Sequence, residues 1–159
     1  MELYFDTSVI VKIYVQEAGS AEVVDFLVRH GVPLALNILQ EFELRNAFAL
    51  KHFRGEISQK EYQALLAQLE HDIKLGRLRK IISVWPAVMQ AAMGMSAKRS
   101  GEVGCRAIDI IHVAAAKIQK CSLFVTNDDR QMKLASLEGV KVVGIGGLPK
   151  AGGGGSSIS

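Results

Sequence analysis

The stretch that decides the fold is LYFDTSVIVKIYVQE, residues 3–17. It opens on a short apolar run, and residues 2–5 are predicted to form a buried β-strand. From Ser8 to Glu17 apolar side chains recur with helical spacing, which predicts a helix. Asp6 therefore lies between two segments that are both expected to be buried. A carboxylate in such a place is costly unless it has a partner or a function.

The same order of strand and helix recurs along the chain, with capping signatures at Asn37 with Gln40 and at Ser58 with Glu61. The predicted strands are residues 2–5, 33–36, 80–84, 122–126 and 140–145. The predicted helices are residues 8–17, 21–30, 38–53, 59–76, 86–100, 107–120 and 129–137, with a loop at 100–106. Short apolar strands that alternate with helices predict an α/β fold, a three-layer α/β/α sandwich around a mainly parallel central sheet.

The composition is that of one globular domain. The chain has 159 residues, 49% of them hydrophobic and 22% charged, which is enough to build a sizeable core. The net charge of +3 is compatible with binding to nucleic acid but does not require it. Two widely spaced cysteines argue against a disulfide scaffold and favour a reduced, cytoplasmic protein. We see no signal peptide and no apolar run of membrane-spanning length, so no membrane association is expected.

Two acidic residues lie at the carboxyl ends of predicted strands. Asp6 follows the strand at 2–5, and Asp128 follows the strand at 122–126. Ligands of open parallel sheets bind outside the carboxyl ends of the strands, so these two carboxylates are expected at one edge. Each is equally well placed to cap the helix that comes next, and both interpretations stay open from the residues alone.

Two further acidic residues are expected to point inward from helices. Asp109 lies in RAIDIIHVAAAKI, a segment that is apolar on nearly every side, where a carboxylate needs a cation, a donor or a metal. Glu43 shares a mostly apolar face of the helix 38–53, whereas Glu41 has Arg45 four residues later, as in an exposed ion pair. Glu43 is therefore the better site candidate of the two.

Four carboxylates that converge on one edge repel one another unless a cation compensates them. Carboxylate oxygens are hard ligands that suit Mg²⁺, with Mn²⁺ as a possible substitute. The sequence has no HExxH, no CxxC and no cluster of Cys and His, so a zinc site is not expected. A magnesium site built only from acids is typical of phosphate chemistry, where the metal activates water and neutralises phosphoryl oxygens.

Four segments together resemble the motifs of PIN-domain nucleases, and in particular the VapC-type toxins of type II toxin–antitoxin systems. They are FDTSVIVKIY, ELRNAF, RAIDIIHVAAA and VTNDDRQMKLA, and the resemblance runs from residue 2 to about residue 145. It implies a PIN-like nuclease domain over residues 1–147, which leaves the Gly/Ser-rich residues 148–159 as a flexible tail. Carried over to this sequence, it implies that Asp6, Glu43, Asp109 and Asp128 hold the metal.

The resemblance also implies an activity and partners. The expected activity is Mg²⁺-dependent endoribonuclease cleavage of tRNA, rRNA or mRNA, which leaves 5′-phosphate and 3′-hydroxyl ends. The expected partners are a small VapB-type antitoxin, whose C-terminal segment covers the active site, and a second copy in a homodimer. Asp128 is adjacent to Asp129, but the family spacing from Thr126 selects Asp128 and leaves Asp129 as a helix-start residue.

Several neighbouring side chains are candidates for supporting roles, each with a simple structural alternative. They are Thr7, Ser8, Asn46, His112 and Thr126 around the acids, and Lys98, Arg99 and Arg106 as possible phosphate contacts. His112 is interpreted as a core residue rather than a catalytic one. Three other functions remain as alternatives: a PIN nuclease in RNA maturation, a non-catalytic binding module, and an aspartate-nucleophile phosphatase. The last is disfavoured because Ser8 stands where a second aspartate is needed.

Overall fold

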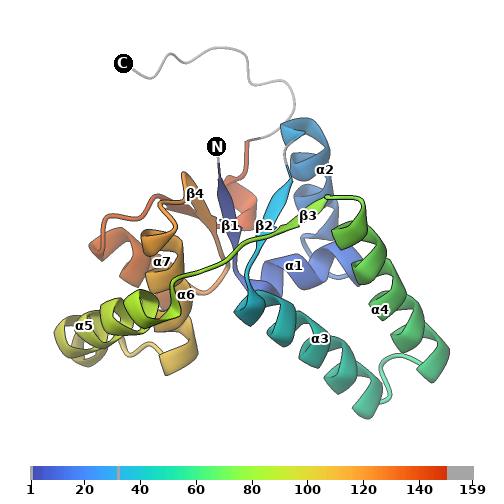
Figure 1. Ribbon diagram of the computed structural model, residues 1–159, viewed down its shortest axis with the longest axis horizontal. Helices are drawn as coiled ribbons and strands as arrows, with labels where there is room; N and C mark the ends of the chain where they lie inside the picture. Colours follow the sequence, from blue (N-terminus) through green and yellow to red (C-terminus); the bar gives the residue numbers. More distant parts are fainter. Residues whose placement is uncertain (1, 32, 150–159) are drawn as a thin grey trace.

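The computed structural model describes residues 2–31 and 33–149, in which strands and helices alternate as expected (Figure 1). The strands are β1 Leu3–Phe5, β2 Leu34–Leu36, β3 Leu78–Lys80, β4 Leu123–Val125 and β5 Val142–Val143. The helices are α1 Thr7–Tyr14, α2 Ser20–His30, α3 Ile38–Phe53, α4 Gln59–Lys74, α5 Trp85–Val103, α6 Ala107–Ile118 and α7 Asp129–Leu137. A 3₁₀ turn, Ile145–Gly147, follows β5.

The strands are parallel wherever they pair. β4 lies between β1 and β5, and β2 pairs with β3. β1 and β2 lie side by side (Figure 1), and across this join the Gln40 side chain of α3 donates a hydrogen bond to the Phe5 carbonyl oxygen at 2.7 Å. The order across the molecule is therefore β3, β2, β1, β4, β5.

Helices cover both faces of this sheet. Helices α1 to α4 lie on one side and α5 to α7 on the other (Figure 1). The side chains of β1 show how the two layers are built, because successive residues of a strand point to opposite faces. Leu3 and Phe5 belong to the core beneath α1 to α4, whereas Tyr4 packs with Phe124 and Val113 beneath α5 to α7. The prediction of a three-layer α/β/α sandwich is confirmed.

The third strand differs from its prediction. It spans Leu78–Lys80 rather than residues 80–84. Leu78 is the residue that enters the core, with 4% of its surface exposed, whereas Ile82 is fully exposed. The ladder with β2 ends at the pair Leu36 and Lys80, so the apolar Ile81 and Ile82 lie beyond the strand.

The other boundaries shift for local reasons. Helix α5 continues to Val103, so most of the predicted loop at 100–106 is helical. Gly104 ends this helix because its φ of 71° is left-handed, a conformation that costs glycine little. β5 is shorter than the predicted strand at 140–145, since the amide of Val140 still bonds to the last turn of α7.

Leu148, assigned from the sequence to the tail, is buried in the core, and the rest of the predicted tail from residue 150 onward lies outside the described residues. None of the described helices is both long and apolar enough to cross a membrane.

Candidate functional site

The four predicted acidic residues come from four elements and line one cavity of about 220 Å³. Asp6 follows β1 and Asp128 shortly follows β4, the neighbouring strand, so both lie at the carboxyl edge of the sheet. Glu43 reaches the cavity from α3, and Asp109 from the first turn of α6. The structure thus brings all four carboxylates together, and their role as metal ligands stays a prediction.

Asp6 occupies the N-cap position of α1, but its side chain makes no capping hydrogen bond. Its carboxylate instead accepts a hydrogen bond from the Ser8 hydroxyl and a long one, at 3.5 Å, from the Gln131 amide. It is only 7% exposed. The capping alternative therefore does not account for Asp6, whose carboxylate serves the cavity.

Asp128 does act as a helix cap. Its Oδ1 accepts a hydrogen bond from the backbone amide of Gln131 at 2.9 Å, and its own amide donates to the Thr126 hydroxyl at 3.1 Å. The same side chain lines the cavity, so the structural and the functional interpretations both apply. Asp129 is exposed and begins α7, as the sequence spacing predicts.

Asp109 is 4% exposed and is held by donors on two sides. Arg106, three residues earlier, donates to both carboxylate oxygens through Nε at 3.0 Å and Nη2 at 3.2 Å. Gln131 Nε2 donates to Oδ1 at 3.1 Å. Burial by itself would raise the pKa of Asp109, but these hydrogen bonds lower it below the usual range. Asp109 is therefore a carboxylate anion at neutral pH.

Glu43 is also held in the ionised form. Its Oε2 accepts hydrogen bonds from the Thr7 hydroxyl at 2.8 Å and from His112 Nε2 at 2.6 Å. Burial would raise the pKa of Glu43, and the two donors lower it. Burial lowers the pKa of His112. The hydrogen bond and charge of Glu43, together with the charge of Asp6, outweigh burial and raise this pKa above its usual value.

Of the polar side chains at this site, Gln131 was not identified from the sequence, and His112 was named there only as a candidate for a supporting role. Gln131 contacts Asp6 and Asp109 through its amide group and Asp128 through its backbone, yet a glutamine in the first turn of a helix carries no signal of this. His112 was interpreted as a core residue. His112 is buried, but its Nε2 contacts Glu43 and lies 3.8 Å from Asp6 Oδ1. Its position three residues after Asp109 is the signal that could have placed it at the site, because residues at this spacing share a helix face.

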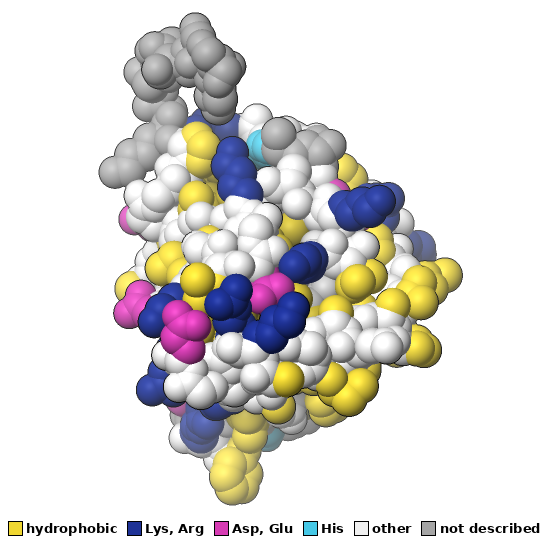
Figure 2. Space-filling view, turned by 90° about the vertical axis from the view of Figure 1, so that its left-hand side faces the viewer, with side chains coloured by type: hydrophobic (Ala, Val, Ile, Leu, Met, Phe, Trp, Pro, Cys, Tyr) yellow, Lys and Arg dark blue, Asp and Glu magenta, His cyan; other side chains and the backbone are white. Residues whose placement is uncertain are grey.

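The remaining candidates divide between the site and the surface. Asn46 is exposed, so it does not orient Glu43. Lys98 is exposed on α5, and Arg99 pairs with Glu102 and Glu138. Figure 2 shows the outer face of α5 to α7, where basic side chains gather beside acidic ones. Of the three cations proposed for phosphate contact, only Arg106 lies at the cavity.

A divalent cation fits this cavity by its chemistry. Four carboxylates supply hard oxygen donors, and the buried Gln131 Oε1 has no hydrogen-bond partner among the described residues. The acids are engaged with Arg106, Gln131, Ser8 and His112, and no three acidic, His or Cys residues of the described chain form a ready-made coordination cluster. The Arg106 side chain is 73% exposed and is free to withdraw as a cation enters.

Arg106→Ala should therefore tighten Mn²⁺ binding severalfold, because it removes a cation that competes for Asp109. Isothermal titration calorimetry with Mn²⁺ measures the change. Arg106→Lys retains the charge without the two-point hydrogen bonding and should give an intermediate affinity. Unchanged or weaker Mn²⁺ binding in Arg106→Ala would contradict the competition between arginine and metal.

Comparison with known proteins places the fold. The chain matches the family model of the PIN domain over residues 3–137, and no match is found among curated proteins. It is similar to the crystal structure of FitAcB from Neisseria gonorrhoeae, with a TM-score of 0.65 and 22% identity over 92% of this chain and 99% of that chain. It is also similar to VapBC2 from Rickettsia felis bound to a DNA fragment from their promoter, with a TM-score of 0.61 and 17% identity over 91% and 98%.

The family match covers most of the chain, and the three-layer fold agrees with it. The motifs that resembled this family in the sequence are those that carry the four cavity acids. The chain belongs to the PIN domain family.

Proposed function

We propose that this protein is a Mg²⁺-dependent endoribonuclease that acts as the toxin of a VapBC-type toxin–antitoxin pair and works as a homodimer. One observation carries the nuclease part: four carboxylates, far apart in the sequence, line one small cavity at the carboxyl edge of the sheet. Such a cluster of like charges is unfavourable unless it serves a cation.

The roles of the residues follow from their contacts. Asp6, Glu43, Asp109 and Asp128 would hold Mg²⁺, which when bound activates water and neutralises charge on the phosphoryl oxygens. Gln131 and His112 fix the orientation of these carboxylates. Arg106, displaced from Asp109, is placed to contact a substrate phosphate at the mouth of the cavity.

Cleavage of a labelled pool of tRNA, rRNA and mRNA tests the proposal. The protein should cut RNA in Mg²⁺ or Mn²⁺, leave 5′-phosphate and 3′-hydroxyl ends, and stop when EDTA removes the metal. Cutting that persists in EDTA would contradict the metal-dependent mechanism. Mn²⁺ binding without cleavage of any RNA in the pool would favour a binding module, whereas trimming of precursor RNA alone would favour RNA maturation.

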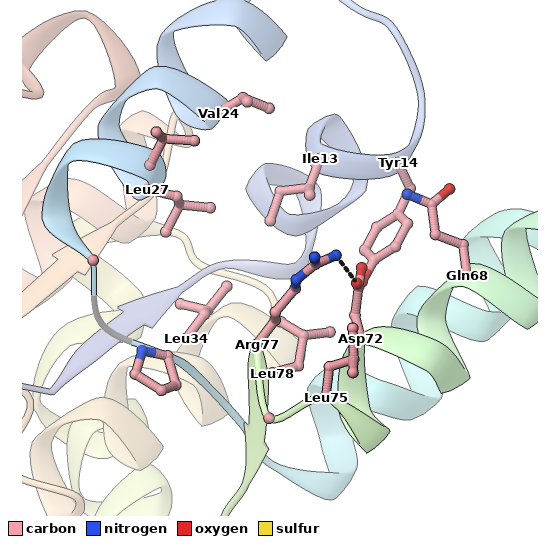
Figure 3. Close-up of a pocket in the computed structure, with 14 residues that line it drawn as sticks. Ile13, Tyr14, Val24, Leu27, Leu34, Gln68, Asp72, Leu75, Arg77 and Leu78 are labelled. Atoms are coloured by element: carbon pink, nitrogen blue, oxygen red, sulfur yellow. Dashed lines mark hydrogen bonds and ion pairs between the residues drawn. The ribbon is translucent and has the colours of Figure 1, made fainter.

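The antitoxin part of the proposal is supported by an apolar groove on another face. This groove has a volume of about 590 Å³ and lies between α1, α2, α4 and the ends of β2 and β3 (Figure 3). Its walls are aliphatic and include Val24 and Leu27 from α2 and Leu34 from β2. Val24 is 41% exposed and Val28, on the same helix, is 75% exposed. Exposed aliphatic side chains around a hollow are typical of a protein-binding surface.

Polar groups stand along one wall of the groove. The Asp72 carboxylate accepts hydrogen bonds from the Tyr14 hydroxyl and from Arg77, both at 3.0 Å (Figure 3). Apolar walls with a few fixed polar groups suit an amphipathic helix that lays its apolar face into the groove. We propose that the antitoxin supplies such a helix.

A further inference from the structure

A chain of buried hydrogen bonds runs from Asn37, at the start of α3, to Glu43 at the cavity. Asn37 Nδ2 donates to the Tyr4 hydroxyl oxygen at 3.1 Å, and that hydroxyl lies 2.9 Å from His112 Nδ1. His112 Nε2 in turn lies 2.6 Å from Glu43 Oε2. Asn37, Tyr4 and His112 are each only 1% exposed, so each must find its hydrogen-bond partners within the protein.

The direction of each hydrogen bond follows from the partners at the ends of the chain. The Asn37 side-chain oxygen accepts a hydrogen bond from the backbone amide of Gln40 at 2.9 Å, which turns the Asn37 NH₂ group toward Tyr4. Burial raises the pKa of Tyr4 well above its usual value, so the phenol keeps its proton. The Tyr4 oxygen accepts from Asn37, and its proton points to His112 Nδ1. In the neutral ring Nδ1 is then the acceptor, and Nε2 carries the hydrogen that is donated to Glu43.

The same oxygen of Glu43 receives both of its donors. Thr7 and His112 bond to Oε2, and no hydrogen bond to Oε1 occurs among the described residues. One carboxylate oxygen is thus fixed by the protein, which leaves the other for the cavity that Glu43 lines. Donors that fix one oxygen of a ligating carboxylate orient the group toward a metal.

We infer that Tyr4 is a positioning residue for the metal site, which acts by holding the His112 ring in the orientation in which Nε2 contacts Glu43. The inference rests on the proposed function, because it takes Glu43 as a metal ligand. Tyr4 itself does not line the cavity, and its effect passes through one imidazole ring. Asn37 links this chain to α3, since it also caps the helix that carries Glu43.

The contact between Tyr4 and His112 is measured by ¹⁵N NMR of the histidine side chains. In wild type the Nδ1 resonance of His112 should show the hydrogen bond with the Tyr4 hydroxyl. Tyr4→Phe keeps the ring that packs against Phe124 but removes the hydroxyl, so this Nδ1 resonance should shift. Tyr62→Phe removes the hydroxyl of a tyrosine that does not line the cavity and should leave the His112 resonances unchanged. An unchanged Nδ1 resonance in Tyr4→Phe would overturn the inference.

Calorimetric titration with Mn²⁺ tests the effect on the metal site without any RNA. Tyr4→Phe should weaken Mn²⁺ binding by about tenfold, the lower end of the range for groups that orient a metal ligand. His112→Gln retains an N–H donor but lacks the ring nitrogen Nδ1 that Tyr4 contacts. In a His112→Gln background, Tyr4→Phe should therefore cause no further loss.

The outcomes separate the inference from the proposed function. If wild type binds Mn²⁺ and Tyr4→Phe binds it equally well, the inference is wrong and the nuclease proposal is unaffected. A loss that persists in the His112→Gln background would assign Tyr4 a packing role and would also overturn the inference. Failure of wild type to bind Mn²⁺ would remove the metal site itself, and the proposed function with it.

Discussion

Asp109→Asn is expected to reduce RNA cleavage by at least about 100-fold, the upper end of the effect seen for groups that only support a metal ligand. Asparagine has the same shape and can still accept a hydrogen bond from Arg106, but it lacks the charge that a divalent cation needs. The folded state should lose only a small part of its stability, because asparagine gives up one of the two acceptor oxygens. Asp109 is one of four like charges around the cavity, so neutralising it relieves repulsion and offsets the weaker contact with Arg106. The measurement compares initial cleavage rates and the thermal midpoints of unfolding.

The adjacent pair of aspartates at the start of α7 provides a matched control. Asp128→Asn should also lose most of the cleavage activity, and asparagine at this position still caps the helix. Asp129→Asn makes the same chemical change one residue later, at an exposed side chain, and should remain active. Equal activity of wild type and Asp109→Asn would place the reaction elsewhere or indicate a contaminating nuclease. Equal loss in Asp128→Asn and Asp129→Asn would contradict the assignment between these neighbours.

Most of the fold could be predicted from the sequence because its signals are local. The capping boxes at Asn37 with Gln40 and at Ser58 with Glu61 form as their spacing predicts. The third strand could not be placed, because Leu78, Arg79 and Lys80 form an edge strand with two exposed charges. Its position depends on pairing with β2, a contact between residues about 44 positions apart that leaves no local periodicity.

The site was predictable only in part, for a related reason. A carboxylate in an apolar segment stands out, since burying it is costly, and this identified Asp109. Gln131, Tyr4 and Asn37 are ordinary residues in their local sequence. Their part in the site depends on contacts with residues more than 20 positions away, such as Gln131 with Asp109 and Tyr4 with His112. A charged residue within an apolar segment can be recognised in a sequence, whereas hydrogen bonds between residues distant in the sequence cannot.

If the groove binds the proposed antitoxin, Val28→Glu should weaken that binding by about 100-fold, because it places an unpaired charge in an apolar interface. Val28 lines the groove between α1, α2 and α4, and its side chain is 75% exposed in the free protein. Glutamate in this exposed helical position should not disturb folding, since its helix propensity exceeds that of valine. RNA cleavage by the purified variant should equal that of wild type, because the groove and the cavity share no lining residue.

Co-purification with a co-expressed VapB-type antitoxin, followed by calorimetry, measures the loss. Phe53→Glu is the matched control: it introduces the same charge at an 85% exposed apolar residue at the end of α3, which does not line the groove. In cells, Val28→Glu should stay toxic when the antitoxin is co-expressed, whereas wild type and Phe53→Glu should be neutralised. If Val28→Glu binds the antitoxin as tightly as wild type, the groove is not its docking surface. If both variants lose binding alike, the effect is one of added negative charge rather than of this groove.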